Sequence, residues 1–452
     1  SLKKEKYIAD YALDHNDARL AARTLRSMRI PLQTFRQWAR LTVLNLCLVA
    51  AAGVLLRYKI LFPLPSVHHK NLLHGHSHFA FSGWVSLALF TAITYVLSEN
   101  KRIAPGRYTV LFWLTQLAAF GMLFTFPFMG YNAVTIAFST LSIFLSYAFA
   151  WVAWKDIASS AIPGMVRCWF YAALLFYVLS SAGAFHLAYL MAGKTGSQSL
   201  YIGSVYFFLH FQYNGWFLFA ILGLFFYQLH SMGVPLRRKY VWFVFRALFF
   251  ACFPAFLLST LWMQLPPVLY RIAAIAGLVQ VGALLLIIRL LAPLRNKVLA
   301  QLAPATRWLW SLALIAFSIK ILLQAISAIP SLSYLAFGFR PVVIGYLHLI
   351  LLGFVSLFLL GYYVQQQLLI GGSATSTFAI GLFTVGVILN EAFLFVQGIA
   401  ATMYTAISFI NYLLFGAAIL LFAAPLLLLL AQLRITATAG LSLQAAQQTQ
   451  SN

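Results

Sequence analysis

Long apolar runs follow one another along almost the whole chain, separated by short polar or basic stretches. About 20 consecutive apolar residues cross the hydrocarbon core of a bilayer as one helix, and continuous runs of this length are helices because a spanning segment must satisfy its own backbone. The pattern predicts an all-α, polytopic membrane protein with twelve transmembrane helices. They are expected near residues 38–60, 74–97, 107–129, 132–154, 165–192, 200–229, 240–262, 267–292, 306–328, 341–369, 376–398 and 404–432.

These runs divide the chain into three parts. Residues 38–433 form the predicted membrane domain, and residues 1–37 a basic segment on the cytoplasmic side. Residues 434–452 are rich in Gln, Ala, Ser and Thr, a composition that cannot bury much apolar surface. We therefore expect a disordered C-terminal tail.

Composition excludes a water-soluble domain. Only 8% of the 452 residues are charged and 63% are hydrophobic, whereas soluble domains carry roughly 25% charged residues. The net charge of +23 does not indicate nucleic-acid binding, because the basic residues lie between apolar runs, as the positive-inside rule expects of cytoplasmic loops. The bias predicts a protein of the bacterial plasma membrane, in contact with lipid, with both termini in the cytoplasm.

Three of the predicted helices share one short motif. His78, His210 and His348 are each followed by a bulky apolar residue, three further positions, a glycine and a large aromatic residue. The copies lie 132 and 138 residues apart, which is four helices each time. This period predicts three pseudo-equivalent four-helix arcs rather than two halves of six helices. It also predicts that the three imidazoles lie at a similar depth in the outer half of the membrane.

The motif makes two histidines candidate haem ligands. The segments around His78 and His348 agree at five positions, and neutral imidazoles on facing helices suit axial ligation of a b-type haem. The alternative is that each imidazole hydrogen-bonds across a helix interface and ligates nothing. His76 competes with His78, because the start of this helix is uncertain by about a turn.

Five further residues are candidates for catalysis because polar groups inside a bilayer are costly to retain. His210 is expected to ligate a second metal, to line a gas-binding pocket or to be a satisfied core histidine, and Tyr213 and Asn214 make its surroundings polar. Lys320 and Glu391 lie deep in the ninth and eleventh predicted helices. They are expected to form an ion pair, with a proton relay as the alternative.

The outer entrance of the second helix carries a cluster of histidines. Imidazole binds both copper and zinc, so the cluster is a candidate Cu or Zn site, with solvated side chains beside a haem as the alternative. Lys70 and Arg340 lie at the outer ends of the two best histidine helices. They could pair with haem propionates or act as ordinary interfacial anchors. The cluster consists of His68, His69, His74, His76 and His78.

Twelve helices with histidines on the second, sixth and tenth resemble subunit I of the haem-copper oxidase superfamily, which includes the nitric-oxide reductases. The resemblance implies that His348 and either His78 or His76 hold a low-spin haem, and that His210 ligates copper or non-haem iron. Two adjacent histidines complete the second metal site in that family, and the predicted helix 240–262 has none. Tyr346 stands where the family has a second helix-ten histidine, and tyrosine can ligate haem iron.

These features predict a b-type haem protein that acts in electron transfer or in redox chemistry of nitric oxide or dioxygen, without a complete binuclear centre. As an enzyme it would be an oxidoreductase. Electrons would come from quinol or from a partner subunit. Two alternatives remain open: a transporter whose histidines handle Cu or Zn, and a non-catalytic structural subunit of a respiratory complex.

Overall fold

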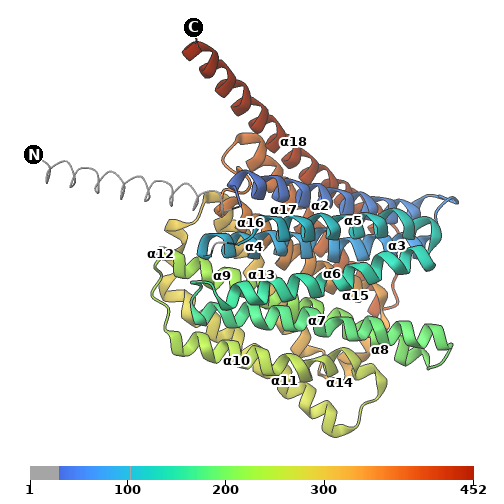
Figure 1. The fold of residues 1–452 in the computed structure, drawn as a ribbon. Coiled ribbons are helices and arrows are strands. Elements are labelled where there is room, and N and C mark those ends of the chain that lie inside the picture. The colour runs from blue at the N-terminus through green and yellow to red at the C-terminus, as the bar shows by residue number, and fades with distance from the viewer. Residues whose placement is uncertain (1–29, 102, 452) are drawn as a thin grey trace, which may run out of the picture.

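The computed structural model of the protein describes residues 30–101 and 103–451. Over these residues the chain is helical without a single strand, and twelve of its helices are long and apolar enough to cross a membrane (Figure 1). The predicted all-α membrane fold is confirmed. Most of the predicted N-terminal segment 1–37 lies outside the described residues.

The observed helices match the predicted spans to within a few residues at most ends. The short helix α14 (Pro330–Gly338) was not predicted. The spans are α2 (Leu32–Leu61), α3 (His69–Phe79) with η1 (Ala80–Ser86) and α4 (Leu87–Asn100), α5 (Pro105–Met129), α6 (Ala133–Ala158), α7 (Gly164–Gly193), α8 (Gln198–His210) with η2 (Phe211–Phe217) and α9 (Leu218–Ser231), α10 (Arg238–Ala255) with η3 (Phe256–Met263), α11 (Pro267–Leu291) with η4 (Ala292–Leu294) and α12 (Arg295–Gln301), α13 (Pro304–Ile326), α15 (Arg340–His348) with η5 (Leu349–Ser356) and α16 (Leu357–Gln365), α17 (Ala374–Thr402) and α18 (Ile410–Ser451).

The turn between α5 and α6 shows how local chemistry sets helix ends. Gly130 ends α5 with a φ of 57°, and a Cβ there would lie 2.9 Å from the side-chain oxygen of Asn71. The Asn132 side chain then accepts hydrogen bonds from the backbone amides of Val134 and Thr135, which caps α6. This turn carries Tyr131, which belongs to the candidate site described below.

The C-terminal tail is drawn as a continuation of the last helix. The chain from residue 434 was expected to be disordered, and in the structure α18 continues to Ser451, beyond the rest of the bundle (Figure 1). Its Ala, Leu and Gln residues have high helix propensity, and neither proline nor repeated glycine interrupts it. Low apolar content predicts exposure to solvent, but it does not by itself exclude a helix.

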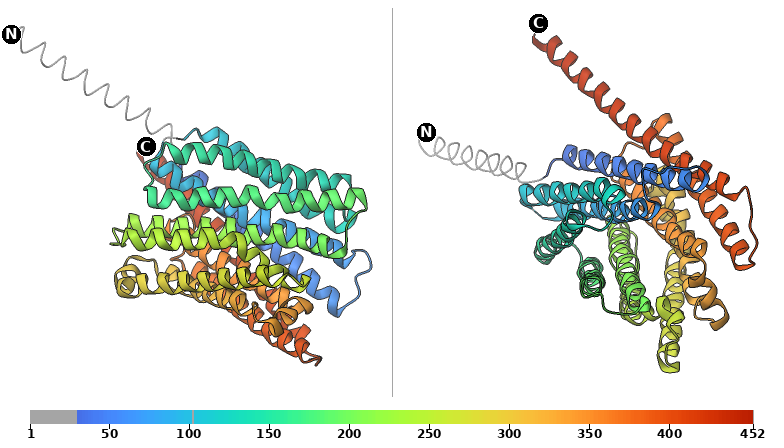
Figure 2. Two further views of the ribbon diagram at one scale, coloured as in Figure 1. Left: turned by 90° about the horizontal axis from the view of Figure 1, so that it is seen from below. Right: turned by 90° about the vertical axis from the view of Figure 1, so that its right-hand side faces the viewer.

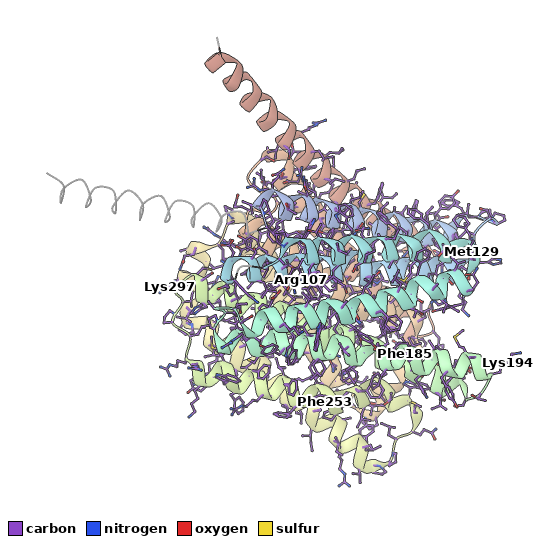
Figure 3. All side chains as sticks on the ribbon, in the orientation of Figure 1. Arg107, Met129, Phe185, Lys194, Phe253 and Lys297 are labelled. Carbon is purple, nitrogen blue, oxygen red and sulfur yellow. The ribbon has the colours of Figure 1, made fainter. Side chains whose placement is uncertain are left out.

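The helices run roughly parallel, and neighbours in sequence mostly pack side by side. The last helix α18 packs along the first, α2, so the two ends of the membrane domain meet (Figure 2). Large apolar side chains such as Phe185 and Phe253 lie exposed on the flanks, while Lys194 and Lys297 mark opposite ends of the bundle (Figure 3). An apolar flank of this extent fits contact with lipid.

The second and sixth spans occupy the centre of the bundle. In their most apolar windows 94% and 83% of residues are buried, against 28% for the fourth span. Each of the three spans that carry the histidine motif contains a π-helical segment, and these are η1, η2 and η5. Such segments account for well under about 1% of residues in proteins and often mark functional sites. The sequence repeat therefore has a structural counterpart in each copy.

Side chains at two positions of the motif also form hydrogen bonds between its copies. The indole nitrogen of Trp84 donates to the Ser356 hydroxyl at 2.8 Å, and that of Trp216 donates to the Ser86 hydroxyl at 3.3 Å. The third equivalent pair is Phe354 and Leu218, two residues that form no such hydrogen bond. The segment η1 is thus joined by hydrogen bonds to both η5 and η2. The division of the bundle into three four-helix arcs stays a prediction.

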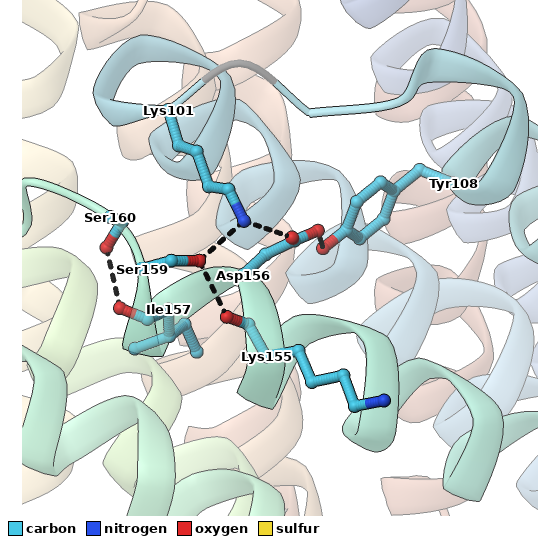
Figure 4. A network of polar contacts seen from close by, with 7 residues as sticks. All are labelled: Lys101, Tyr108, Lys155, Asp156, Ile157, Ser159 and Ser160. Carbon is cyan, nitrogen blue, oxygen red and sulfur yellow. Dashed lines mark hydrogen bonds and ion pairs between the residues drawn. The ribbon is translucent and has the colours of Figure 1, made fainter.

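A polar network joins the ends of three spans at the end of the bundle where α4 finishes. Lys101 pairs with Asp156 at 2.7 Å and donates to the Ser159 hydroxyl, while the Tyr108 hydroxyl donates to the other oxygen of Asp156 (Figure 4). Lys101–Asp156 is the one ion pair in the described part of the chain. Because Asp156 is buried, both partners are needed to satisfy its charge.

Candidate functional site

The side of α3 that carries His74 and His78 faces α5. The His78 ring stacks on Phe126 with ring centroids 4.7 Å apart, and its Nε2 lies 3.4 Å from the Tyr131 hydroxyl. Burial raises the pKa of the Tyr131 phenol, so this hydroxyl stays neutral beside the imidazole. These contacts hold the His78 ring against α5, and the pairing of His78 with His348 at a haem stays a prediction.

His76 points from α3 toward α2. Its Nδ1 lies 3.0 Å from the carbonyl oxygen of Val49. Because a carbonyl can only accept, Nδ1 carries the hydrogen and Nε2 keeps its lone pair. Gly53, one turn further along α2, lies against the ring: a Cβ there would make an ordinary van der Waals contact, 3.5 Å from the imidazole Cε1. Within the described residues Nε2 of His76 has no hydrogen-bond partner.

His348 has the same arrangement on α15. Its Nδ1 lies 2.8 Å from the carbonyl oxygen of Ile344, one turn earlier on the helix, and its Nε2 has no hydrogen-bond partner in the part of the chain described. His348 and His76 are close enough to interact electrostatically. Both side chains are only partly covered by the surrounding helices.

Arg57 is a member of this group that the sequence analysis missed. It lies on α2 one turn beyond Gly53 and acts electrostatically on both His76 and His348. Over residues 30–101 and 103–451 no acidic side chain pairs with it. The sequence feature that could have identified Arg57 is an arginine inside an otherwise apolar helical run. A cation inside the membrane needs an anionic partner.

The predicted propionate partners lie further out. Lys70 and Arg340 are both exposed; Lys70 acts electrostatically on His74, and Arg340 acts on His69. Of these three cations, Arg57 is the one that acts electrostatically on both imidazoles with open Nε2 atoms, while Lys70 and Arg340 lie at the mouths of their helices.

His210 takes part in a buried chain of hydrogen bonds. Its Nε2 donates to the carbonyl oxygen of Cys252 at 2.8 Å, and its Nδ1 accepts from the Asn214 amide at 3.0 Å. Lys320 in turn donates to the side-chain oxygen of Asn214. Both ring nitrogens are engaged, so this arrangement favours the satisfied core histidine among the three interpretations of His210.

The expected ion pair between Lys320 and Glu391 is wrong. Lys320 bonds to Asn214, and Glu391 accepts a hydrogen bond of 3.1 Å from the neighbouring Asn390 amide. The lone ion pair of the described residues lies elsewhere, at the end of α4. An amide can satisfy a buried ammonium group as a neutral acceptor, and hydropathy alone could not reveal this choice.

A cavity of about 660 Å³ gathers most of the other candidates. It lies between the sixth, seventh, ninth, tenth and eleventh spans, toward the end of the bundle where α15 begins, with α14 beside it. Tyr346 lines it, two residues before His348 and therefore on nearly the opposite side of α15. The polar residues of its wall include His210, Tyr213, Asn214, Gln324, Tyr346 and Glu391.

The histidine cluster at the start of the second span is spread over different directions. The rings of His74 and His78 are 6.5 Å apart, whereas His76 turns to α2. Nε2 of His74 is buried with no hydrogen-bond partner. No group of three His, Cys, Asp or Glu side chains placed to hold a metal ion occurs among the described residues.

Comparison with known proteins adds no family assignment: no family model matches the chain, and no curated protein matches it. The chemistry of the site must therefore be argued from its own residues.

Proposed function

We propose that this protein binds one b-type haem between His76 and His348 and transfers electrons, or handles a small gas, in the outer half of a bacterial plasma membrane. The observation that supports this is the shared geometry of the two imidazoles. Each donates its Nδ1 hydrogen to a backbone carbonyl and leaves Nε2 open. Histidines that ligate metals characteristically donate their other ring nitrogen in this way.

The surrounding residues fit the group as well. The two open imidazole nitrogens would hold the haem iron, and the Arg57 guanidinium would supply a cation for the propionates. The haem would provide one-electron redox chemistry, while the chain fixes the ligand orientation and excludes water. Among the predicted ligands, His76 replaces His78 in this proposal.

The proposal includes no complete binuclear centre. His210 uses both of its ring nitrogens, and the seventh span carries no histidine. We infer a divergent relative of the haem-copper oxidase superfamily, specialised for electron transfer, with both termini in the cytoplasm. As part of the same proposal, electrons enter from a membrane quinol or from a partner subunit.

The test is a visible absorption spectrum of the full chain, expressed with ample haem and purified in detergent. We expect a Soret band, sharp α and β bands after reduction, and one haem per chain by pyridine haemochromogen. His348→Ala removes the sharp α band, whereas His186→Ala, which changes another membrane histidine, leaves the spectrum unchanged. A colourless wild-type protein overturns the proposal. Copper or zinc without porphyrin would instead favour a metal-handling transporter.

A further inference from the structure

A small pocket lies where the first and last spans of the bundle meet, since α18 packs along α2 (Figure 2). Its volume is about 100 Å³, and its walls come from residues 33–40 of α2, residues 368–370 after α16 and residues 432–436 of α18. It lies at the start of α2, roughly 25 Å along that helix from Arg57 at 1.5 Å per residue. The pocket is therefore separate from the proposed haem site.

Two arginines of α2 line the pocket. Arg36 and Arg40 are four residues apart, so they share one face of the helix, and Arg36 acts electrostatically on Arg40. Like charges at this spacing destabilise a helix. Neither guanidinium pairs with an acidic side chain among the described residues. Two half-buried cations thus lie together without a counter-charge from the described part of the chain.

The hydrogen bonds of these arginines leave donors available. Each guanidinium has five N–H donors. Nε of Arg36 donates to the carbonyl oxygen of Gln367 at 3.0 Å, and the other nitrogens of this group have no acceptor in the described chain. Arg40 donates through Nε to the carbonyl oxygen of Arg36 at 3.2 Å and through Nη1 to the Thr436 hydroxyl at 2.9 Å. These bonds orient both groups and leave several of their N–H donors for a ligand.

A buried glutamine fixes the opposite wall of the pocket. Gln432 of α18 is 4% exposed. Its side-chain oxygen accepts from the backbone amide of Ile370 at 2.8 Å, and its side-chain nitrogen donates to the carbonyl oxygen of the same residue at 3.0 Å. The chain at Ile370 is therefore tied to α18. A wall held in this way keeps its shape without a ligand, and such preorganisation lowers the cost of binding.

We propose that this pocket binds a phosphate group, either the headgroup phosphate of an anionic phospholipid or free phosphate. Planar guanidinium groups match the geometry of phosphate oxygens and bind them bidentately. A volume of about 100 Å³ admits one compact anion, whereas pockets for small organic ligands occupy roughly 300–1,000 Å³. Basic pockets between the ends of spanning helices are typical sites for anionic headgroups. The inference goes beyond the proposed function and does not depend on the haem.

The test is native mass spectrometry of the delipidated full chain in detergent, titrated with phosphatidylglycerol, phosphatidylcholine or inorganic phosphate. We expect one saturable phosphatidylglycerol per chain, bound at least about tenfold more tightly than phosphatidylcholine, whose cationic headgroup the arginines repel. Arg36→Gln and Arg40→Gln should each weaken binding at least about tenfold, as loss of a charge-assisted hydrogen bond can do. Arg167→Gln is the matched control, because Arg167 is also half-buried at this end of the bundle but does not line the pocket.

Competition by inorganic phosphate distinguishes the two sources. Binding of inorganic phosphate as tight as that of phosphatidylglycerol identifies free phosphate as the ligand, and weaker binding identifies the phospholipid. Lack of saturable binding of both overturns the inference. Equal weakening by Arg167→Gln, or equal affinity for phosphatidylcholine, also overturns it, by showing attraction to the surface in general. If one pocket variant fails to fold, the other variant and the phosphatidylcholine comparison still decide.

Discussion

An imidazole binds a metal through the nitrogen that its other hydrogen bond leaves free. His76 and His348 both donate through Nδ1 to a carbonyl oxygen, which leaves Nε2 as the open site. In His210 the second nitrogen accepts from Asn214, so no lone pair remains. Three histidines of similar sequence context thus differ in what they can bind.

The first prediction distinguishes the two neighbouring histidines of α3. His76→Ala should abolish the low-spin haem spectrum, because it removes one axial ligand. His78→Ala should leave the band positions unchanged, because His78 stacks on Phe126. Visible spectra of the two purified variants provide the comparison. Loss of the α band in His78→Ala alone would reverse the ligand assignment.

The second prediction concerns the buried chain through Asn214. Asn214→Leu leaves the Lys320 ammonium without its acceptor, and an uncompensated buried charge costs about 3 kcal/mol or more of unfolding free energy. Adding Lys320→Met should recover a substantial part of this loss, because the charge is removed. Thermal unfolding in detergent measures both variants. Additive effects of the two substitutions would contradict the contact.

The proposed haem site keeps the pair of helices that the sequence predicted and takes His76 rather than His78 from the second span. His76 and His78 are two positions apart, so they point in directions that differ by about 200° on a helix. Polar residues lie on several sides of α3, and the apolar window of the second span is 94% buried, so no single polar face indicates its rotation. The distinction depends on packing against α2 and α5, which hydropathy does not encode.

At the scale of elements, each copy of the weak sequence motif coincides with a π-helical segment. A π-helical turn holds an extra residue, and this shifts the face that the following helix presents. The shift occurs at equivalent places of the three motif copies, in η1, η2 and η5. The lengths of the spans were predictable because membrane thickness determines them. The π-helical segments and α14 were not, because they arise from contacts between distant parts of the chain.

The third prediction tests the hydrogen bond between η1 and η5. Ser356→Ala leaves the buried indole N–H of Trp84 without its acceptor, which should lower the unfolding free energy by about 1–3 kcal/mol. Ser318→Ala removes a hydroxyl that bonds only to a carbonyl of its own helix, so it should change stability by less than about 0.5 kcal/mol. Equal melting temperatures of the two variants would show that the contact adds nothing.

At the scale of the whole molecule, charge asymmetry predicts orientation. The fourth prediction uses two exposed positions at opposite ends of the sixth span, Thr195 and Ser231. With the termini in the cytoplasm, Thr195→Cys should react with a membrane-impermeant maleimide in intact cells, and Ser231→Cys only after lysis. The unsubstituted chain gives the background of the three native cysteines. The opposite labelling pattern would invert the assigned topology.

The most direct test of the account is an electron cryomicroscopy map of the full chain purified with haem. We predict planar porphyrin density between α3 and α15, with Nε2 of His76 and Nε2 of His348 directed at its centre and Arg57 beside a propionate. Density of lipid or side chains alone in that space, or a porphyrin held by His78 instead, would contradict the central claim.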